Sequence, residues 1–202
     1  MTACRALGAT AAAWLMASAA CLAAPPDGPS FNCKGVAPGS IAALVCGDAQ
    51  LAALDRQLAG VYAQARQKAK NERPPTLQAE QRGWVKGRDD CWKAGDERAA
   101  CVAQSYRRRT AELQARYRLV PARGPVRWAC DGNAAHELVV TFFDTEPASL
   151  LAERGDSQSL MFQVPAASGT QYEGRNERYW EHQGEVTLRW GYGAPELRCK
   201  PQ

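Results

Sequence analysis

Six of the eight cysteines in this 202-residue chain lie beyond residue 30, and they limit the folds that the chain can adopt. No two have the Cys-x-x-Cys spacing of a metal or redox site, and none clusters with a histidine. An even set of cysteines in an exported chain indicates disulfides, because oxidising compartments preserve such bonds. We therefore predict a disulfide-bonded fold with no metal site and no cofactor, built on Cys33, Cys46, Cys91, Cys101, Cys130 and Cys199.

Residues 1–23 have the composition of a secretory signal peptide. Arg5 is the only charge in the first 26 residues, and an alanine-rich apolar run, residues 6–20, follows it. This order is typical of a cleaved export signal, and the run is too weakly apolar to favour a membrane-spanning helix. We expect a periplasmic protein. Membrane attachment would follow only if Cys21 is lipidated, and Ser18, three residues before it, is a poor match to a lipid-attachment motif.

Residues 24–120 show the hydrophobic period of helices. Asp48 is a good N-cap for a first helix to about Lys70, and two further helices are expected from Thr76 and over about residues 97–117. The apolar face of the first helix is formed by Leu51, Leu54, Leu58, Val61 and Ala65. Such a small three-helix domain is marginal without cross-links. The short local loops favour the pairs Cys33–Cys46 and Cys91–Cys101.

Several polar and aromatic residues in this half could be either structural or functional. A charge buried among helices needs a partner, so we expect Asp55 to form a structural ion pair with Arg88 or Arg109. Trp84 and Trp92 are expected to pack within the domain rather than to bind sugar.

From residue 126 onwards the hydrophobic period changes to two. Residues such as Leu138, Val140 and Phe142 alternate with polar ones, and turn residues such as Asp131-Gly132-Asn133 separate the runs. This pattern predicts an all-β domain over residues 126–202, either an antiparallel sandwich or a barrel. Cys130 and Cys199 fall on the inward phase at opposite ends of this domain, which favours a bond between them. Residues 121–125, rich in proline and glycine, are expected to be a linker.

The charges are unevenly shared between the two halves. Residues 24–122 hold 16 Lys/Arg and 10 Asp/Glu, a net +6, whereas residues 123–202 hold 8 and 11, a net −3. The second half would therefore attract a basic macromolecule. The arginine run 107–109 is expected to be a solvated helix face. Because no aromatic residues interleave with the basic ones, we expect no nucleic-acid partner.

The first half resembles the LprI-type lysozyme-inhibitor N-terminal domain, over about Pro29 to Tyr117. The matching features include its four cysteines, Leu54-Asp55, Trp84 and Arg88-Asp89. The resemblance implies a helical, disulfide-bonded domain of the cell envelope.

The second half resembles the MliC/PliC family of c-type lysozyme inhibitors, over residues 126–199. The resemblance implies a small antiparallel β-barrel that inhibits c-type lysozyme by inserting a Ser-Gly loop into the active-site cleft, which protects peptidoglycan. The residues that carry the match are Trp128-Ala129-Cys130-Asp131, Ser168-Gly169, Tyr172, Trp180, Glu185-Val186 and Cys199. The lysozyme-binding residues that it implies are Ser168, Gly169, Tyr172, Trp180 and His182.

The sequence departs from the family at the position fourteen residues after Ser168. His182 stands where the family has a lysine, and Ala166 replaces a serine two residues before Ser168. A histidine is positive only when protonated, with an ordinary pKa of about 6.5. We therefore expect any inhibition to strengthen as the pH falls.

Two other functional classes stay open. The chain could be a non-catalytic envelope-binding module whose inhibitor loop has drifted. Ser168 and His182 could also suggest a hydrolase pair, but the sequence offers no obvious third member and no oxyanion motif. We therefore predict no catalytic residues, and an inhibitor rather than an enzyme.

Overall fold

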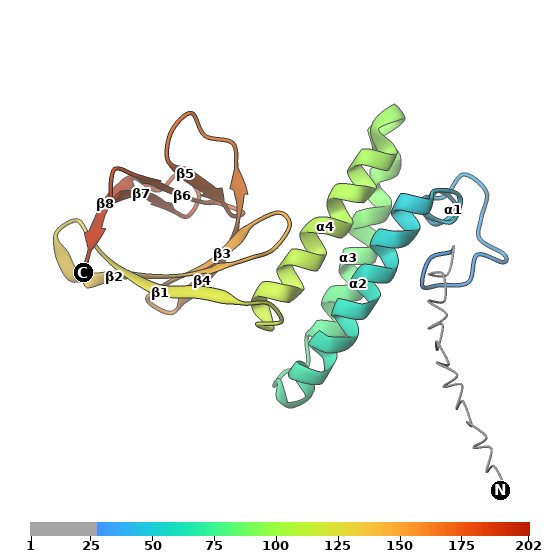
Figure 1. The fold of residues 1–202 in the computed structure, drawn as a ribbon, viewed down its shortest axis with the longest axis horizontal. Helices are drawn as coiled ribbons and strands as arrows, with labels where there is room; N and C mark the ends of the chain where they lie inside the picture. Colours follow the sequence, from blue (N-terminus) through green and yellow to red (C-terminus); the bar gives the residue numbers. More distant parts are fainter. Residues whose placement is uncertain (1–27) are drawn as a thin grey trace, which may run out of the picture.

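The structure is a computed structural model that describes residues 28–202, so the predicted signal peptide and Cys21 lie outside it. It contains a helical unit followed by a barrel, which lie side by side (Figure 1). Within the described residues, no helix has the length and apolar character needed to cross a membrane.

The helical unit confirms the three predicted helices and adds a shorter one. They are α1 (Ile41–Gly47), α2 (Ala49–Lys68), α3 (Leu77–Asp89) and α4 (Arg98–Arg116), with 3₁₀ turns at Ala69–Asn71 and Asp90–Glu97. The Asp48 side chain accepts hydrogen bonds from the backbone N–H groups of Gln50 and Leu51, as its role as an N-cap requires. At seven residues, α1 is too short for its hydrophobic period to be read from the sequence.

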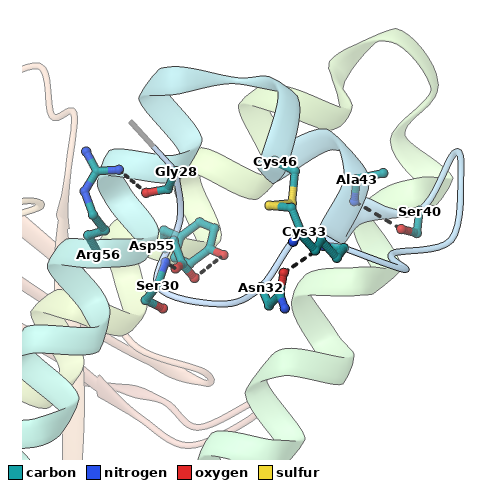
Figure 2. The surroundings of a disulfide bond; sticks show 11 residues. Gly28, Ser30, Asn32, Cys33, Ser40, Ala43, Cys46, Asp55 and Arg56 are labelled. Carbon is teal, nitrogen blue, oxygen red and sulfur yellow. Dashed lines mark hydrogen bonds between the residues drawn. A yellow bond between two sulfur atoms is a disulfide. The ribbon is translucent and has the colours of Figure 1, made fainter. Parts of the chain in front are cut away.

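Three disulfides have the predicted partners: Cys33–Cys46, Cys91–Cys101 and Cys130–Cys199. The first ties the N-terminal arm to the end of α1 (Figure 2). The same arm is held to α2 at two further points. The Ser30 backbone N–H donates to Asp55 at 2.6 Å, and the Arg56 guanidinium donates to the Gly28 carbonyl.

The buried charges of this unit form a relay through a tyrosine rather than a direct ion pair. The Tyr106 hydroxyl donates to Asp55 at 2.9 Å and accepts from Arg88 at 2.8 Å. Arg88 makes its ion pair with Asp89 at 2.6 Å. The expected pairing of Asp55 with Arg88 or Arg109 is therefore wrong, because the phenol occupies the space between the charges. Burial raises the pKa of the Tyr106 hydroxyl above its usual range, so it remains a donor.

Arg109 finds other partners on the same inner surface. It donates to Gln81 of α3 at 3.0 Å and pairs with Glu112 at 2.8 Å. Trp84 packs edge-on against Tyr106, with ring centroids 5.3 Å apart. Trp92 is 62% exposed, so the expectation that it packs within the domain is wrong.

The second unit is a closed barrel of eight antiparallel strands, each paired with the next in the chain. The strands are β1 (Ala122–Cys130), β2 (Asn133–Phe143), β3 (Ser149–Arg154), β4 (Ser157–Val164), β5 (Thr170–Glu173), β6 (Glu177–His182), β7 (Glu185–Trp190) and β8 (Glu196–Pro201). Pairing of β1 with β8 closes the barrel, with Cys130 directly opposite Cys199. This closing contact decides between the sandwich and the barrel. Leu138 and Val140 of the alternating pattern lie in the core, as predicted, whereas in β4 the buried residue is Met161 and its neighbours Leu160 and Phe162 are only partly buried.

Residues 122–125, expected to be part of a linker, belong to β1. Ala122 and Arg123 pair with Phe143 and Phe142, and the register shifts before Val126 resumes pairing. Gly124 adopts a φ of 112° at this irregularity, and a Cβ there would lie 2.9 Å from the Val140 carbonyl oxygen. Glycine and proline therefore form a bulge that extends the strand rather than ending it.

A small apolar cluster joins the two units. Ala115 of α4 packs with Phe143 and Leu151 of the barrel, all of them at most 6% exposed. Nearby, the Arg108 guanidinium lies 4.5 Å from the centre of the Phe162 ring. Part of the basic run on α4 therefore faces the barrel instead of being a wholly solvated helix face.

The relay through Tyr106 can be tested by removing its hydroxyl. Tyr106→Phe leaves Asp55 with one donor fewer inside the unit and should lower the free energy of unfolding by about 1–3 kcal/mol. Urea unfolding followed by far-UV circular dichroism would measure the change. Tyr192→Phe is the control, because that side chain is 94% exposed. Identical unfolding midpoints for the two variants would contradict the role assigned to the relay.

Candidate functional site

The loop between β4 and β5 carries the predicted Ser-Gly turn, and it is open to solvent. Residues 165–169 are all exposed, including Ser168 and Gly169. The loop begins where β4 ends at Val164 and ends where β5 begins at Thr170. A serine at this point offers one O–H donor and two lone pairs to a second molecule.

Gly169 lets the loop pass unusually close to the neighbouring strand. Its φ is 69°, and a Cβ there would lie 2.1 Å from the Glu181 carbonyl oxygen and 3.2 Å from the Cβ of His182. Only glycine fits this approach and this backbone conformation without rearrangement. The contact places the Ser-Gly turn directly beside His182, although the two are far apart along the chain.

Trp180 connects the two parts of the site. Its indole N–H donates to the Ser168 carbonyl oxygen at 2.9 Å. Its ring stacks on the His182 imidazole, with centroids 5.5 Å apart and planes 15° from parallel. One side chain therefore holds the loop backbone and also orients the histidine. The sequence singled out Trp180 but gave no sign of these two contacts.

Tyr172 lies beneath the loop rather than on the surface. It is 5% exposed and packs edge-on against Phe142 and Tyr179, with ring centroids 5.8 and 6.1 Å away. Burial raises the pKa of its hydroxyl. The prediction that Tyr172 contacts lysozyme directly does not fit this position, because its ring points inward from β5 and is buried in the core. Its geometry instead supports the base of the loop.

Two acidic neighbours of His182 are already engaged, and Arg198 lines the same shallow pocket. Glu185, its partner in the β6–β7 register, forms an ion pair with Lys200 at 3.2 Å. Glu181 accepts a hydrogen bond from Tyr179 at 2.9 Å. Burial, together with this bond, raises the pKa of the Tyr179 hydroxyl, which stays protonated as the donor. His182 itself is partly exposed, so its imidazole can contact a partner.

A cavity of about 500 Å³ opens at the foot of the loop, where sequence reasoning predicted nothing. Its wall includes Arg123, Thr170, Tyr172 and Glu181. Trp128 also lines it, and within the described chain the buried indole N–H of this residue has no hydrogen-bond partner. The strand residues show their alternation in the sequence, but only barrel closure brings β1, β5 and β6 around one hollow.

In residues 28–202, no group of three or more His, Cys, Asp or Glu side chains could hold a metal ion. Across the same residues, no hydrogen bond links the Ser168 hydroxyl to His182, which stacks on Trp180 instead. The site is an exposed, pre-shaped loop suited to contacting another molecule.

Comparison with known families finds one match in each unit. Residues 33–113 match the family described as "Lysozyme inhibitor LprI". Residues 128–197 match the family described as "Membrane-bound lysozyme-inhibitor of c-type lysozyme", or MliC. The two matches follow the order predicted from the sequence.

Individual proteins extend the comparison. A crystal structure of Pseudomonas aeruginosa MliC in complex with hen egg white lysozyme matches 41% of this chain and 84% of its own, with 21% identity and a TM-score of 0.33. "Lipoprotein LprI" from Mycobacterium bovis is 30% identical over 176 residues, which cover 84% of this chain and 87% of the relative. The protein of the same name from Mycobacterium tuberculosis matches to the same extent. With this identity over more than four fifths of both chains, the protein belongs to the LprI family, and residues 128–197 of its C-terminal unit match the MliC family.

Proposed function

We propose that this protein inhibits c-type lysozyme by inserting the Ser168-Gly169 loop into the cleft of the enzyme. The observation that carries the proposal is the bond between Trp180 and the Ser168 carbonyl, which fixes an exposed loop beside His182. The family descriptions of both units name lysozyme inhibition, which supports the same conclusion. Tyr172 supports the loop from the core, and Trp180 and His182 form its flank.

The chemistry of the target fits this loop. A c-type lysozyme uses two carboxyl groups, one protonated and one ionised, on either side of the scissile bond. The Ser168 hydroxyl can donate to a carboxylate, and a protonated His182 adds a second, charged donor. Because the loop is already held by Trp180 and Gly169, binding costs less conformational entropy than ordering a free loop would.

The location of the protein follows from the same function. Lysozyme attacks peptidoglycan, so an inhibitor that protects it belongs in the periplasm. The predicted signal peptide and the lipoprotein names of the LprI relatives support placement in the envelope. Mass spectrometry of the mature protein would separate cleavage after Ala23 from lipidation at Cys21.

Removing the hydroxyl of Ser168 tests the loop. Ser168→Ala should raise the inhibition constant against hen lysozyme by about tenfold or more, since a hydrogen bond to a charged group is lost. The thermal unfolding midpoint should not change, because the side chain is exposed. Ser157→Ala, on an exposed serine at the start of β4, is the control. Unaltered inhibition by a folded Ser168→Ala variant would refute the loop assignment.

The close approach at Gly169 gives a second test. Gly169→Ala places a Cβ against the Glu181 carbonyl and should displace the loop, whereas Gly184→Ala has a similar φ, 77°, with nothing within 4 Å of the new Cβ. We expect a clear loss of inhibition from the first variant and little change from the second. Lysis of a cell-wall suspension by lysozyme provides the assay. Equal behaviour of the two variants would show that the loop position is unimportant.

His182 predicts the response to pH. Inhibition should strengthen as the pH falls from about 8 to about 6, because a histidine is a cation only when protonated, whereas the lysine of the family pattern carries a permanent charge. His182→Lys should inhibit more tightly at the upper end and lose most of the dependence. Measuring both proteins against the same lysozyme removes the enzyme's own pH response, and His136→Gln controls for the other histidine. A flat profile for the unmodified protein would rule out this role for His182.

A further inference from the structure

A pocket of about 350 Å³ opens in the helical unit, well separated in sequence from the inhibitor loop. The N-terminal arm, α2 and α3 form its walls. The lining includes three aromatic and three polar residues: Phe31, Tyr62, Trp84, Asp55, Gln81 and Arg88. The volume lies at the small end of the range for ligand sites, and the mixture of apolar walls with a few polar groups is typical of them.

The aromatic walls are held in place but remain accessible. Phe31, Tyr62 and Trp84 are all partly exposed. Trp84 is fixed by its edge contact with Tyr106 and by the Arg88 guanidinium, which lies 5.7 Å from the centre of its ring. A fixed indole provides a flat apolar surface at low entropic cost, onto which the apolar face of a ring-shaped ligand can pack.

The Asp55 carboxylate in the pocket can accept further hydrogen bonds. Asp55 is only 8% exposed, and each carboxylate oxygen takes one hydrogen bond, from Ser30 or Tyr106. No Lys or Arg in the described part of the chain forms an ion pair with it. Because a carboxylate offers about four acceptor positions, it can still accept hydrogen bonds from a ligand.

A second polar group is a fixed donor. The Gln81 side-chain oxygen accepts from Arg109 at 3.0 Å, and a guanidinium can only donate, so the amide orientation is determined. Within residues 28–202 the Gln81 amide nitrogen donates no hydrogen bond, which leaves its two hydrogens available. Arg109 is 4% exposed and thus acts as a rigid support for this amide.

The charges of the pocket select the class of ligand. Asp55 and Arg88 are both buried and lie on either side of the Tyr106 hydroxyl, so an anion would meet the Asp55 carboxylate and a cation would meet the Arg88 guanidinium. The Arg88 nitrogens are engaged by Asp89 and Tyr106, which leaves little for an acidic group. A purely apolar ligand would separate the Asp55 carboxylate from water without donating a hydrogen bond to it, which is unfavourable.

We propose that this pocket binds an uncharged saccharide, one or two sugar rings in size. Contrary to the expectation from the sequence, Trp84 would then bind sugar as well as pack within the unit. A sugar ring offers an apolar face to Trp84 and Tyr62, and its hydroxyls can donate to Asp55 and accept from Gln81. The pocket would give the protein a glycan-binding function alongside inhibition. It does not depend on the Ser168 loop.

The test uses N,N′-diacetylchitobiose as the probe and the full exported chain. Calorimetric titration should show saturable binding. Trp84→Ala should weaken it by about tenfold, as expected for loss of an aromatic contact. Trp92→Ala should bind normally, because that tryptophan lies outside the pocket. Ser168→Ala should also bind normally, so failure of the inhibitor proposal leaves this result unaffected.

A second variant is needed in case Trp84→Ala unfolds the helical unit. Gln81→Glu keeps an acceptor for Arg109 and replaces the amide donor with an acceptor, so it should weaken sugar binding while the unfolding midpoint is retained. No heat of binding with the unmodified protein overturns the proposal. So does equal binding by Trp84→Ala and Trp92→Ala. If only the de-N-acetylated, amine-bearing disaccharide binds, the pocket recognises a cation and the proposal is also overturned.

Discussion

The pairing of β1 with β8, locked by Cys130–Cys199, is the constraint on which the barrel depends. The two cysteines sit opposite each other in the register and are fully buried, so the covalent bond and the last strand pair close the sheet together. A loop of 69 residues is closed in this way, worth roughly 4 kcal/mol by the chain-entropy model. Closure also removes both edges of the sheet, which would otherwise present unpaired backbone groups.

The shape of the Ser168-Gly169 loop depends on the closed barrel. β5 has only four residues, yet it carries Tyr172 into an aromatic cluster with Phe142 and Tyr179. With its base anchored in the core, the loop is positioned by backbone contacts from β6. Gly169 accepts the close approach and Trp180 donates to the carbonyl of Ser168. The exposed serine is thus held by a scaffold that does not itself need to contact a partner.

The helical unit follows a different principle, in which polar groups replace part of a small core. The phenol of Tyr106 separates and satisfies Asp55 and Arg88, while Asp55 also holds the N-terminal arm through Ser30. The relay links the arm, α2, α3 and α4. Without the Tyr106 hydroxyl, the buried Asp55 carboxylate would lose a hydrogen-bond donor, which is energetically costly. Asp55 and Arg88 also line the pocket beside Trp84. The residues that stabilise the unit are therefore the ones that a ligand in this pocket would contact. Contacts of α4 with Phe143 and Leu151 join this unit to the barrel.

Much of this protein could be predicted from its sequence, because the responsible signals are local. The three long helices follow from periodic leucines and the Asp48 cap, the strands from alternation, and the cysteine partners from short loops and strand phase. Ser168 and His182 are predicted as site residues from their spacing in a family pattern. Tertiary structure alone decided the rest. It turned residues 122–125 into a bulged strand, buried Tyr172, placed a phenol between Asp55 and Arg88, and set Trp180 between Ser168 and His182. Each of these outcomes depends on which strands or helices pack against each other, which no local pattern encodes.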